Sequence, residues 1–174
     1  MHSYTLLSAG MATALTVAAP ALAGPGDFQP GPLLIEFGPV ATVDSDVAIP
    51  AGHVFRVSYD TSKQSEDGAL NNTLTGAARF LNMHVASGVP EGDIHLAIVV
   101  HGSAVRDVTT ASAGPNADLV AALLEHGARI YVCGQSAVWY DIGNDDLLPG
   151  VDMALSAMTV HALLQADGYT LNPF

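Results

Sequence analysis

The sequence predicts a three-layer α/β/α domain with a mostly parallel five-stranded sheet, preceded by a Pro/Gly-rich N-terminal arm. From residue 53 onward, segments rich in β-branched residues alternate with segments of helical periodicity. Residues 94–100 are almost continuously apolar, as expected of a strand that helices cover on both faces of a parallel sheet. The 174 residues, 49% of them hydrophobic, suffice for one domain with a sizeable core.

Residues 1–23 have the pattern of a signal peptide. The apolar run from Leu6 to Ala19 is shorter than the roughly 20 residues of a membrane-spanning helix, and small residues at Ala21 and Ala23 suit a signal peptidase. The segment before Leu6 carries no Lys or Arg, which is unusual for such a leader. We expect cleavage after Ala23, a periplasmic location, and no membrane attachment of the mature chain.

Residues 24–52 form the predicted extended arm. Five prolines and several glycines exclude a long helix and most sheet pairing from this segment. Within the arm, the apolar residues 33–37 suit either a short edge strand or a hydrophobic plug. The arm can pack on its own domain or reach a neighbouring subunit, and the sequence leaves both arrangements open.

Residues 53–174 form the predicted α/β domain, and its first half contains two strands and a helix. Residues 53–59 combine β-branched and aromatic residues and end at polar residues, which predicts the first core strand. Apolar residues recur at helical spacing from Ala69 to Val85, until Gly88 and Pro90 stop the pattern. The second strand, residues 94–100, ends at His101.

The second half repeats the alternation. It contains a helix from Pro115 to Gly127, a strand at 129–133, a short helix at 135–140, a strand at 151–155, a helix from Ser156 to Gly168 and a strand at 169–172. Pro115 with Asn116, and Ser156, are the expected N-caps, and Gly127 and Gly168 are the expected helix stops. An acidic loop at 141–149 separates the short helix from the fourth strand.

The charge balance disfavours two classes of partner. The chain contains five Lys and Arg residues and 17 Asp and Glu residues, so its formal net charge is −12. All these residues lie beyond Ala23 and remain after the expected cleavage. Nucleic acids and anionic membranes are bound through basic patches, which this composition does not offer. We therefore expect neither as a partner.

The chain has a single cysteine, Cys133, which cannot form an internal disulfide. It is buried and inert, paired between chains, or a free thiol with chemistry of its own. It ends the third strand, and the following Gly134, Gln135 and Ser136 suit a helix start, whose N–H groups favour a thiolate. Cysteine is also among the residue types most often buried, so the spacing leaves a structural and a reactive role open.

Other polar residues follow the ends of neighbouring strands. Because ligands gather outside the carboxyl ends of open parallel sheets, we expect a pocket there that is rimmed by Ser103, Gly134, Gln135, Ser136 and Ser156, with Cys133 and His101 as its catalytic residues. His101 is the expected acid/base or electrostatic neighbour of the thiol, although a histidine at a strand end is more often a hydrogen-bonded structural residue than a catalyst. The remaining histidines, including His53, His126 and His161, are too scattered for a ligand pattern, so we predict neither a metal site nor a cofactor.

Several motifs resemble the DsrE/DsrF-like proteins, and among them the exported branch with a signal peptide and a Pro-rich arm. They are the AARFLNMH run from Ala77, AIVVHG from Ala97, IYVCGQS from Ile130, and LLPG from Leu147 with ALSA from Ala154. The resemblance covers residues 53–174 and implies a five-stranded parallel domain that forms homo- or hetero-oligomers, often trimers or hexamers; for this chain we expect a homo-oligomer. Better understood members relay sulfur in the cytoplasm through a persulfide on a cysteine at the position of Cys133.

Three hypotheses follow for function. The first is a sulfur carrier in which Cys133 accepts a sulfane sulfur and passes it to an acceptor protein or small thiol. The second is a non-catalytic oligomeric module that binds a small molecule or metal and in which Cys133 is structural. The third is an intersubunit disulfide through Cys133 in an oxidising compartment.

Overall fold

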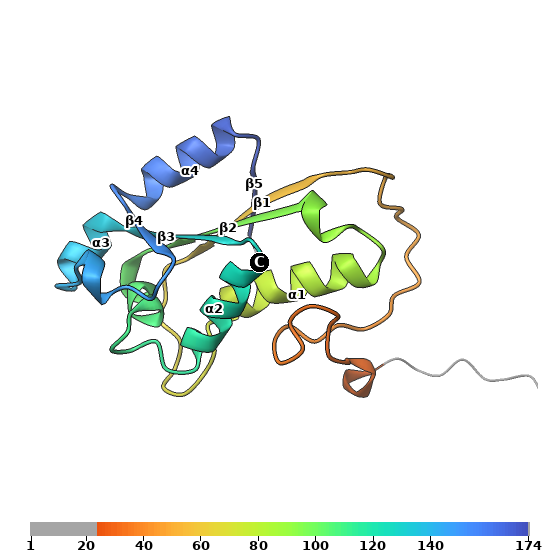
Figure 1. Cartoon of the computed structure of the whole chain (residues 1–174), viewed down its shortest axis with the longest axis horizontal. Coiled ribbons are helices and arrows are strands. Elements are labelled where there is room, and N and C mark those ends of the chain that lie inside the picture. Colours follow the sequence, from red (N-terminus) through yellow and green to blue (C-terminus); the bar gives the residue numbers. More distant parts are fainter. Residues whose placement is uncertain (1–23, 174) are drawn as a thin grey trace, which may run out of the picture.

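Five parallel strands form the centre of the computed structural model, which describes residues 24–173 (Figure 1). They are β1 (Phe55–Thr61), β2 (Ile94–Val100), β3 (Arg129–Cys133), β4 (Val151–Ala154) and β5 (Thr170–Asn172), in the spatial order β4-β3-β2-β1-β5. All neighbouring pairs are parallel, which confirms the predicted α/β fold class. The predicted signal peptide and its cleavage site lie outside the described residues.

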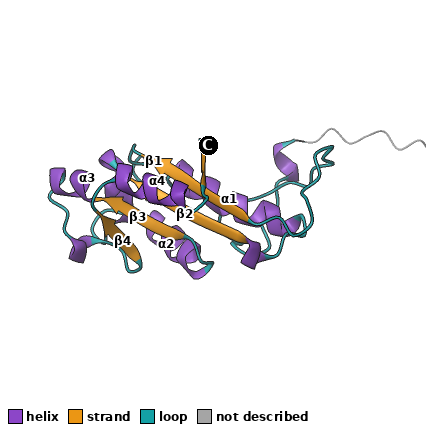
Figure 2. Cartoon of the chain, turned by 90° about the horizontal axis from the view of Figure 1, so that it is seen from above, coloured by secondary structure: helices purple, strands orange, loops and turns teal. Residues whose placement is uncertain are grey.

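Helices cover both faces of the sheet. They are α1 (Asn72–Ala86), α2 (Asn116–Glu125), α3 (Gly134–Trp139) and α4 (Ala157–Ala166), with short 3-10 turns η1 (Pro25–Asp27), η2 (Glu91–Asp93), η3 (Gly102–Val108) and η4 (Asn144–Asp146). Figures 1 and 2 show α1 and α2 on one face, α4 on the other, and α3 beside the carboxyl ends of β3 and β4. Among residues 24–173, no helix combines the length and the apolar character needed to cross a membrane.

The alternation of side chains along β2 explains why the two faces differ. Leu96, Ile98 and Val100 belong to the larger core beneath α1 and α2. Ala97 and Val99 face the opposite way and pack in a smaller cluster under α4. Both sets are almost fully buried, as the apolar run of this strand predicts.

Several element boundaries differ from the sequence prediction by one residue, and those of the first strand and the first helix differ by more. The first strand was expected at residues 53–59, but it spans Phe55–Thr61 because Asp60 and Thr61 continue the pairing with β2. The first helix was expected from Ala69 but begins at Asn72, after an Asn71 N-cap whose side chain accepts hydrogen bonds from the main chain of the first turn. The polar Asp60 is therefore part of the sheet.

Helix α2 begins where predicted, with Pro115 as its N-cap residue, but no side chain caps it. The Asn116 side chain points elsewhere, and its Oδ1 accepts a hydrogen bond from the Asn71 main chain at 2.7 Å. Asn71 in turn donates to the buried Asp107 at 2.8 Å. This buried polar network joins the starts of α1 and α2 to η3, the turn that follows β2.

The arm docks on α1 through one buried amide. Asn82 accepts hydrogen bonds from the Leu33 and Leu34 main chain and donates to three arm carbonyls, at distances from 2.8 to 3.1 Å. Leu34, 3% exposed, inserts into the larger core. Residues 33–37 therefore form a plug and not an edge strand. The arm packs on its own domain (Figure 1).

Candidate functional site

Cys133 lies where the carboxyl end of β3 meets the start of α3, and it is the N-cap residue of that helix. Its neighbours Ile130 and Val132 belong to the core beneath α1 and α2, so the alternation of a strand places Cys133 on the α4 face. The register pairs it with Ala154 at the end of β4. The residue is only 6% exposed.

The surroundings of the thiol favour its charged form. Burial raises the pKa of Cys133, but hydrogen bonds from the Ser136 hydroxyl and from the Ala157, Ser136 and Gln135 main chain outweigh it, and the pKa is lowered. Ala157 is the first residue of α4, whereas Gln135 and Ser136 lie in the first turn of α3. The sulfur is thus held between the starts of two helices.

Ser136 connects this site to β2. Its hydroxyl oxygen accepts a hydrogen bond from the Gly102 N–H at 2.9 Å, so its own hydrogen is free to point at the sulfur. Gly102 has φ +53°, and a Cβ there would lie 2.5 Å from the Ser62 carbonyl oxygen. Only glycine suits this turn, which fixes the donor that orients Ser136.

Gly134 permits the close approach of the two helix starts. A Cβ at this position would lie 2.5 Å from the Ala154 carbonyl oxygen at the end of β4. The chain between β4 and α4 is only two residues long, so the position of Ala154 determines that of Ala157. The absent side chain of Gly134 is therefore what allows α4 to reach the thiol.

A second polar cluster lies on the same face of the sheet, at the end of β1. The Asp60 carboxylate binds two histidines, with His101 Nε2 3.0 Å from Oδ2 and His161 Nε2 2.7 Å from Oδ1. Burial raises the pKa of Asp60, but the hydrogen bonds and charge of His161 and His101 outweigh it, so the pKa is lowered. This arrangement fixes both imidazole rings at the rim.

The sequence prediction identified His101 but missed Asp60 and His161. The predicted first strand ends at residue 59, just before Asp60, and His161 is one of the histidines whose scattered positions gave no ligand pattern. The position of His161 in its helix could have indicated a place near the site. It lies one turn, about 5–6 Å along the axis, beyond Ala157, whose N–H faces the thiol. His161 Nδ1 is buried and has no hydrogen-bond partner within the described part of the chain.

The other predicted rim residues lie near the carboxyl ends of the strands, but their polar groups are engaged locally. The Ser103 hydroxyl accepts a hydrogen bond from Gln64 at 3.0 Å and donates to Ser62, so it holds the loop after β1. Gln135 donates to the Leu155 carbonyl at 3.4 Å. Ser156 caps α4 by accepting from the Thr159 N–H at 3.1 Å, as expected of it. Only Ser136 directs its side chain to the thiol.

Within residues 24–173, no group of three or more His, Cys, Asp and Glu side chains is arranged to hold a metal ion. In the Asp60 cluster the two histidines bind different carboxylate oxygens. Asp60, His101 and His161 interact through hydrogen bonds and charge. A carboxylate paired with two imidazoles is suited to proton transfer and electrostatic stabilisation.

Comparison with known proteins places the domain in context. The family model described as DsrE/DsrF-like matches residues 53–173. A solved structure, a protein of unknown function (MTH1491) from Methanobacterium thermoautotrophicum, superposes with a TM-score of 0.56 at 18% identity and covers 69% of this chain and 99% of its own. At that identity the likeness concerns the fold alone. No curated protein sequence matches the chain.

Proposed function

Because the chain belongs to the DsrE/DsrF-like family, we propose that it is an exported sulfur carrier that holds a sulfane sulfur on Cys133 as a persulfide. The observation that supports this best is the set of donors around the sulfur. One hydroxyl and three main-chain N–H groups lower the pKa of Cys133, although the residue is buried. Surroundings that favour the charged form are what a nucleophilic cysteine requires, because the thiolate is the reactive species.

The proposed chemistry has two balanced steps. The Cys133 thiolate attacks the outer sulfur of thiosulfate, the S–S bond breaks, and sulfite leaves with the electron pair, which leaves Cys133–S–S⁻ on the protein. An acceptor thiolate then attacks the outer sulfur of this persulfide and regenerates the Cys133 thiolate. A polysulfide serves equally as donor, with a shortened polysulfide as the leaving group. No external oxidant or reductant is consumed.

The histidine cluster suits a supporting role in this scheme. Asp60 accepts from His101 Nε2, so Nδ1 is the ring atom left to exchange a proton with a donor or acceptor at the rim. His161 is held by the same carboxylate and lies on the helix whose first N–H faces the thiol. We assign His101 to proton transfer and His161 to positioning of α4.

Mass spectrometry tests the carrier function directly. After incubation with thiosulfate or polysulfide, the intact protein is expected to gain roughly 32 Da for each sulfur atom held as persulfide. Dithiothreitol should remove the added mass, and Cys133→Ser should never acquire it. A wild-type protein that stays at its original mass, and whose thiol reacts with iodoacetamide no faster than a denatured control at pH 7, would sink the proposal.

The low exposure of Cys133 favours one competing function, a binding module in which this residue is structural. In that case Cys133→Ala should lower the unfolding free energy by filling less of the site, and the native thiol should be inert to alkylation. Under the carrier proposal the native thiol is alkylated rapidly at neutral pH. The two functions therefore predict opposite results in the same alkylation experiment.

We further propose that the mature chain is a periplasmic homo-oligomer. Large apolar side chains are exposed on α3 and at the start of α4, next to the proposed site, among them Trp139 at 82% and Met158 at 79%. Sedimentation of the wild type should give a trimer or hexamer, and the double variant Trp139→Ser, Met158→Ser should shift it towards monomer. N-terminal sequencing of the exported protein should begin at Gly24. A wild-type monomer at micromolar concentration would contradict the first part, and an unprocessed N-terminus the second.

A further inference from the structure

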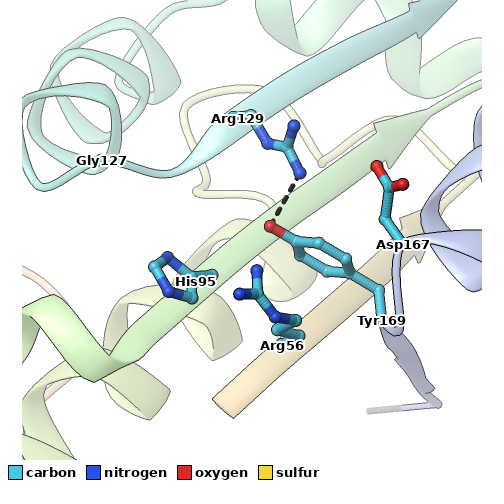
Figure 3. A pocket seen from close by; sticks show the side chains of 6 residues that line it. All are labelled: Arg56, His95, Gly127, Arg129, Asp167 and Tyr169. Atoms are coloured by element: carbon cyan, nitrogen blue, oxygen red, sulfur yellow. Dashed lines mark hydrogen bonds between the residues drawn. The ribbon is translucent and has the colours of Figure 1, made fainter. Parts of the chain in front are cut away.

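A polar pocket opens at the end of the sheet opposite Cys133. It has a volume of about 560 Å³ and is lined by Arg56, His95, Gly127, Arg129, Asp167 and Tyr169. Figure 3 shows the guanidinium groups of Arg56 and Arg129 directed towards the Tyr169 ring, with His95 at one side and Asp167 at the other. The volume lies within the range of small-molecule sites, roughly 300 to 1,000 Å³.

Strand register assembles the basic residues of this pocket. Arg56 on β1 pairs with His95 on β2, while Arg129 begins β3 and pairs two residues further along β2. All three lie on the α4 face, because their strand neighbours belong to the core beneath α1 and α2. Four residues of β3, about 13 Å, separate Arg129 from Cys133, so the pocket is distinct from the proposed sulfur site.

The pocket offers many hydrogen-bond donors and few acceptors. Arg129 donates to the Tyr169 hydroxyl at 2.7 Å, which leaves the phenolic hydrogen and the other guanidinium hydrogens available. The Arg56 guanidinium forms no hydrogen bond or ion pair with any of residues 24–173. The one acidic residue of the lining, Asp167, is more than 4.0 Å from either guanidinium.

The charge here is opposite to that of the chain as a whole. Two of the five Lys and Arg residues of a protein of net charge −12 line one pocket, opposed by one carboxylate. Two close guanidinium groups without carboxylate partners repel each other and disfavour a cationic ligand. An apolar ligand would leave these donors without partners, whereas an oxyanion satisfies them with charge-assisted hydrogen bonds.

We propose that this pocket binds an oxyanion with two negative charges, either a free sulfate or phosphate or the corresponding head group of a small organic ester. Arg56 and Arg129 hold the anion, and the Tyr169 hydroxyl donates to it. The volume exceeds that of a single tetrahedral anion, so the pocket has room for an organic group beside the Tyr169 ring. Asp167 limits the affinity by repulsion from the rim.

Isothermal titration calorimetry with sodium sulfate, sodium phosphate and phenyl phosphate tests the proposal, with ionic strength held constant by sodium chloride. We expect saturable binding with one site per chain. Arg56→Gln and Arg129→Gln should each weaken it by about tenfold or more, since each loses charge-assisted hydrogen bonds. Lys63→Gln is the matched control, because Lys63 is exposed and outside the pocket, and it should bind as the wild type does.

Two further variants separate binding from folding. Tyr169→Phe keeps the ring and removes the hydroxyl, so it should weaken binding a few-fold, whereas Asp167→Asn removes a repelling charge and should tighten it. Tighter binding in Asp167→Asn cannot result from damage to the fold. Phenyl phosphate that binds more tightly than inorganic phosphate indicates an organic ester, and equal or weaker binding indicates the free anion.

The proposal is overturned if none of the three anions binds saturably with a Kd of 10 mM or below, which corresponds to a binding free energy of about 3 kcal/mol in magnitude. It is also overturned if Lys63→Gln weakens binding as much as the two arginine variants, since the effect would then reflect net charge only. Cys133→Ser should leave the affinity unchanged. The outcome is therefore independent of whether Cys133 carries sulfur.

Discussion

The Ser136→Ala variant gives the sharpest test of how the Cys133 thiolate is stabilised. Its hydroxyl is the largest of the contributions that lower the pKa of Cys133, and it is placed by the Gly102 N–H at 2.9 Å. Alanine removes this donor and leaves the main-chain N–H groups of Gln135, Ser136 and Ala157 in place. The pKa of Cys133 should therefore rise in the variant.

The size of the effect follows from one lost hydrogen bond to a charged group. Such a bond contributes about 1.5–3 kcal/mol, which at a pH below both pKa values lowers the thiolate fraction by about 10- to 150-fold. The variant thiolate is also more basic and hence more nucleophilic, which recovers almost half of the effect on a logarithmic scale. On the acidic side of both profiles, alkylation should be about 4- to 15-fold slower in Ser136→Ala than in the wild type.

The assay measures the iodoacetamide rate of the native protein from pH 5 to pH 10. In the wild type the midpoint of the rate profile should lie below the ordinary pKa of a cysteine thiol, about 8.5, because the pKa is lowered. The variant's midpoint should lie higher. Above both midpoints, where both thiols are ionised, the more basic variant should react faster, so the two profiles cross.

That crossing separates electrostatics from access. A variant that merely opened or closed the site would shift the rates in one direction at all pH values. Profiles that are parallel, or a wild-type midpoint at or above the ordinary cysteine pKa of about 8.5, would refute the reasoning that Ser136 stabilises the thiolate. Ser156→Ala is a useful control, since it removes the cap of α4 and not the direct donor to the sulfur.

Three further predictions concern the scaffold. Gly38→Ala should destabilise the docked arm by about 2 kcal/mol or more, because φ is +59° and the new Cβ would lie 2.3 Å from the Arg79 main-chain nitrogen. Limited proteolysis should therefore cut the arm faster in this variant. Gly26→Ala is the control and should change nothing, since a Cβ there meets no atom within 4 Å. Asp60→Asn should be less stable than the wild type above about pH 4, and the difference in unfolding free energy should shrink as the pH falls through the lowered pKa of Asp60. Urea unfolding between about pH 2.5 and 7 measures this difference. A difference that stays constant over this range would contradict the pairing with His101 and His161. Gly134→Ala should lower the free energy of urea unfolding by about 1–3 kcal/mol and slow the alkylation of Cys133 at pH 6, because the new Cβ would push β4 and α4 away from the thiol. An unchanged alkylation rate would show that the start of α4 does not stabilise the thiolate.

Local patterns in the sequence determine most of the fold. The apolar run of β2, the helical spacing in α1 and the glycines after the helices predict the alternating elements, and these depend on residues close together in the chain. The position of Cys133 at a strand end before a helix start is local too, and the structure places it there. Side-chain alternation then puts Cys133 on the face opposite the larger core.

The surroundings of the thiol and the pocket at the far end of the sheet could come only from the tertiary structure. Asp60 and His161 are 101 residues apart, and the N–H of Ala157 reaches Cys133 because β4 pairs with β3 and Gly134 leaves room between them. Arg56 and Arg129 meet through strand register in the same way. No short-range pattern encodes such contacts, since they depend on which strands are neighbours and on how closely their backbones approach.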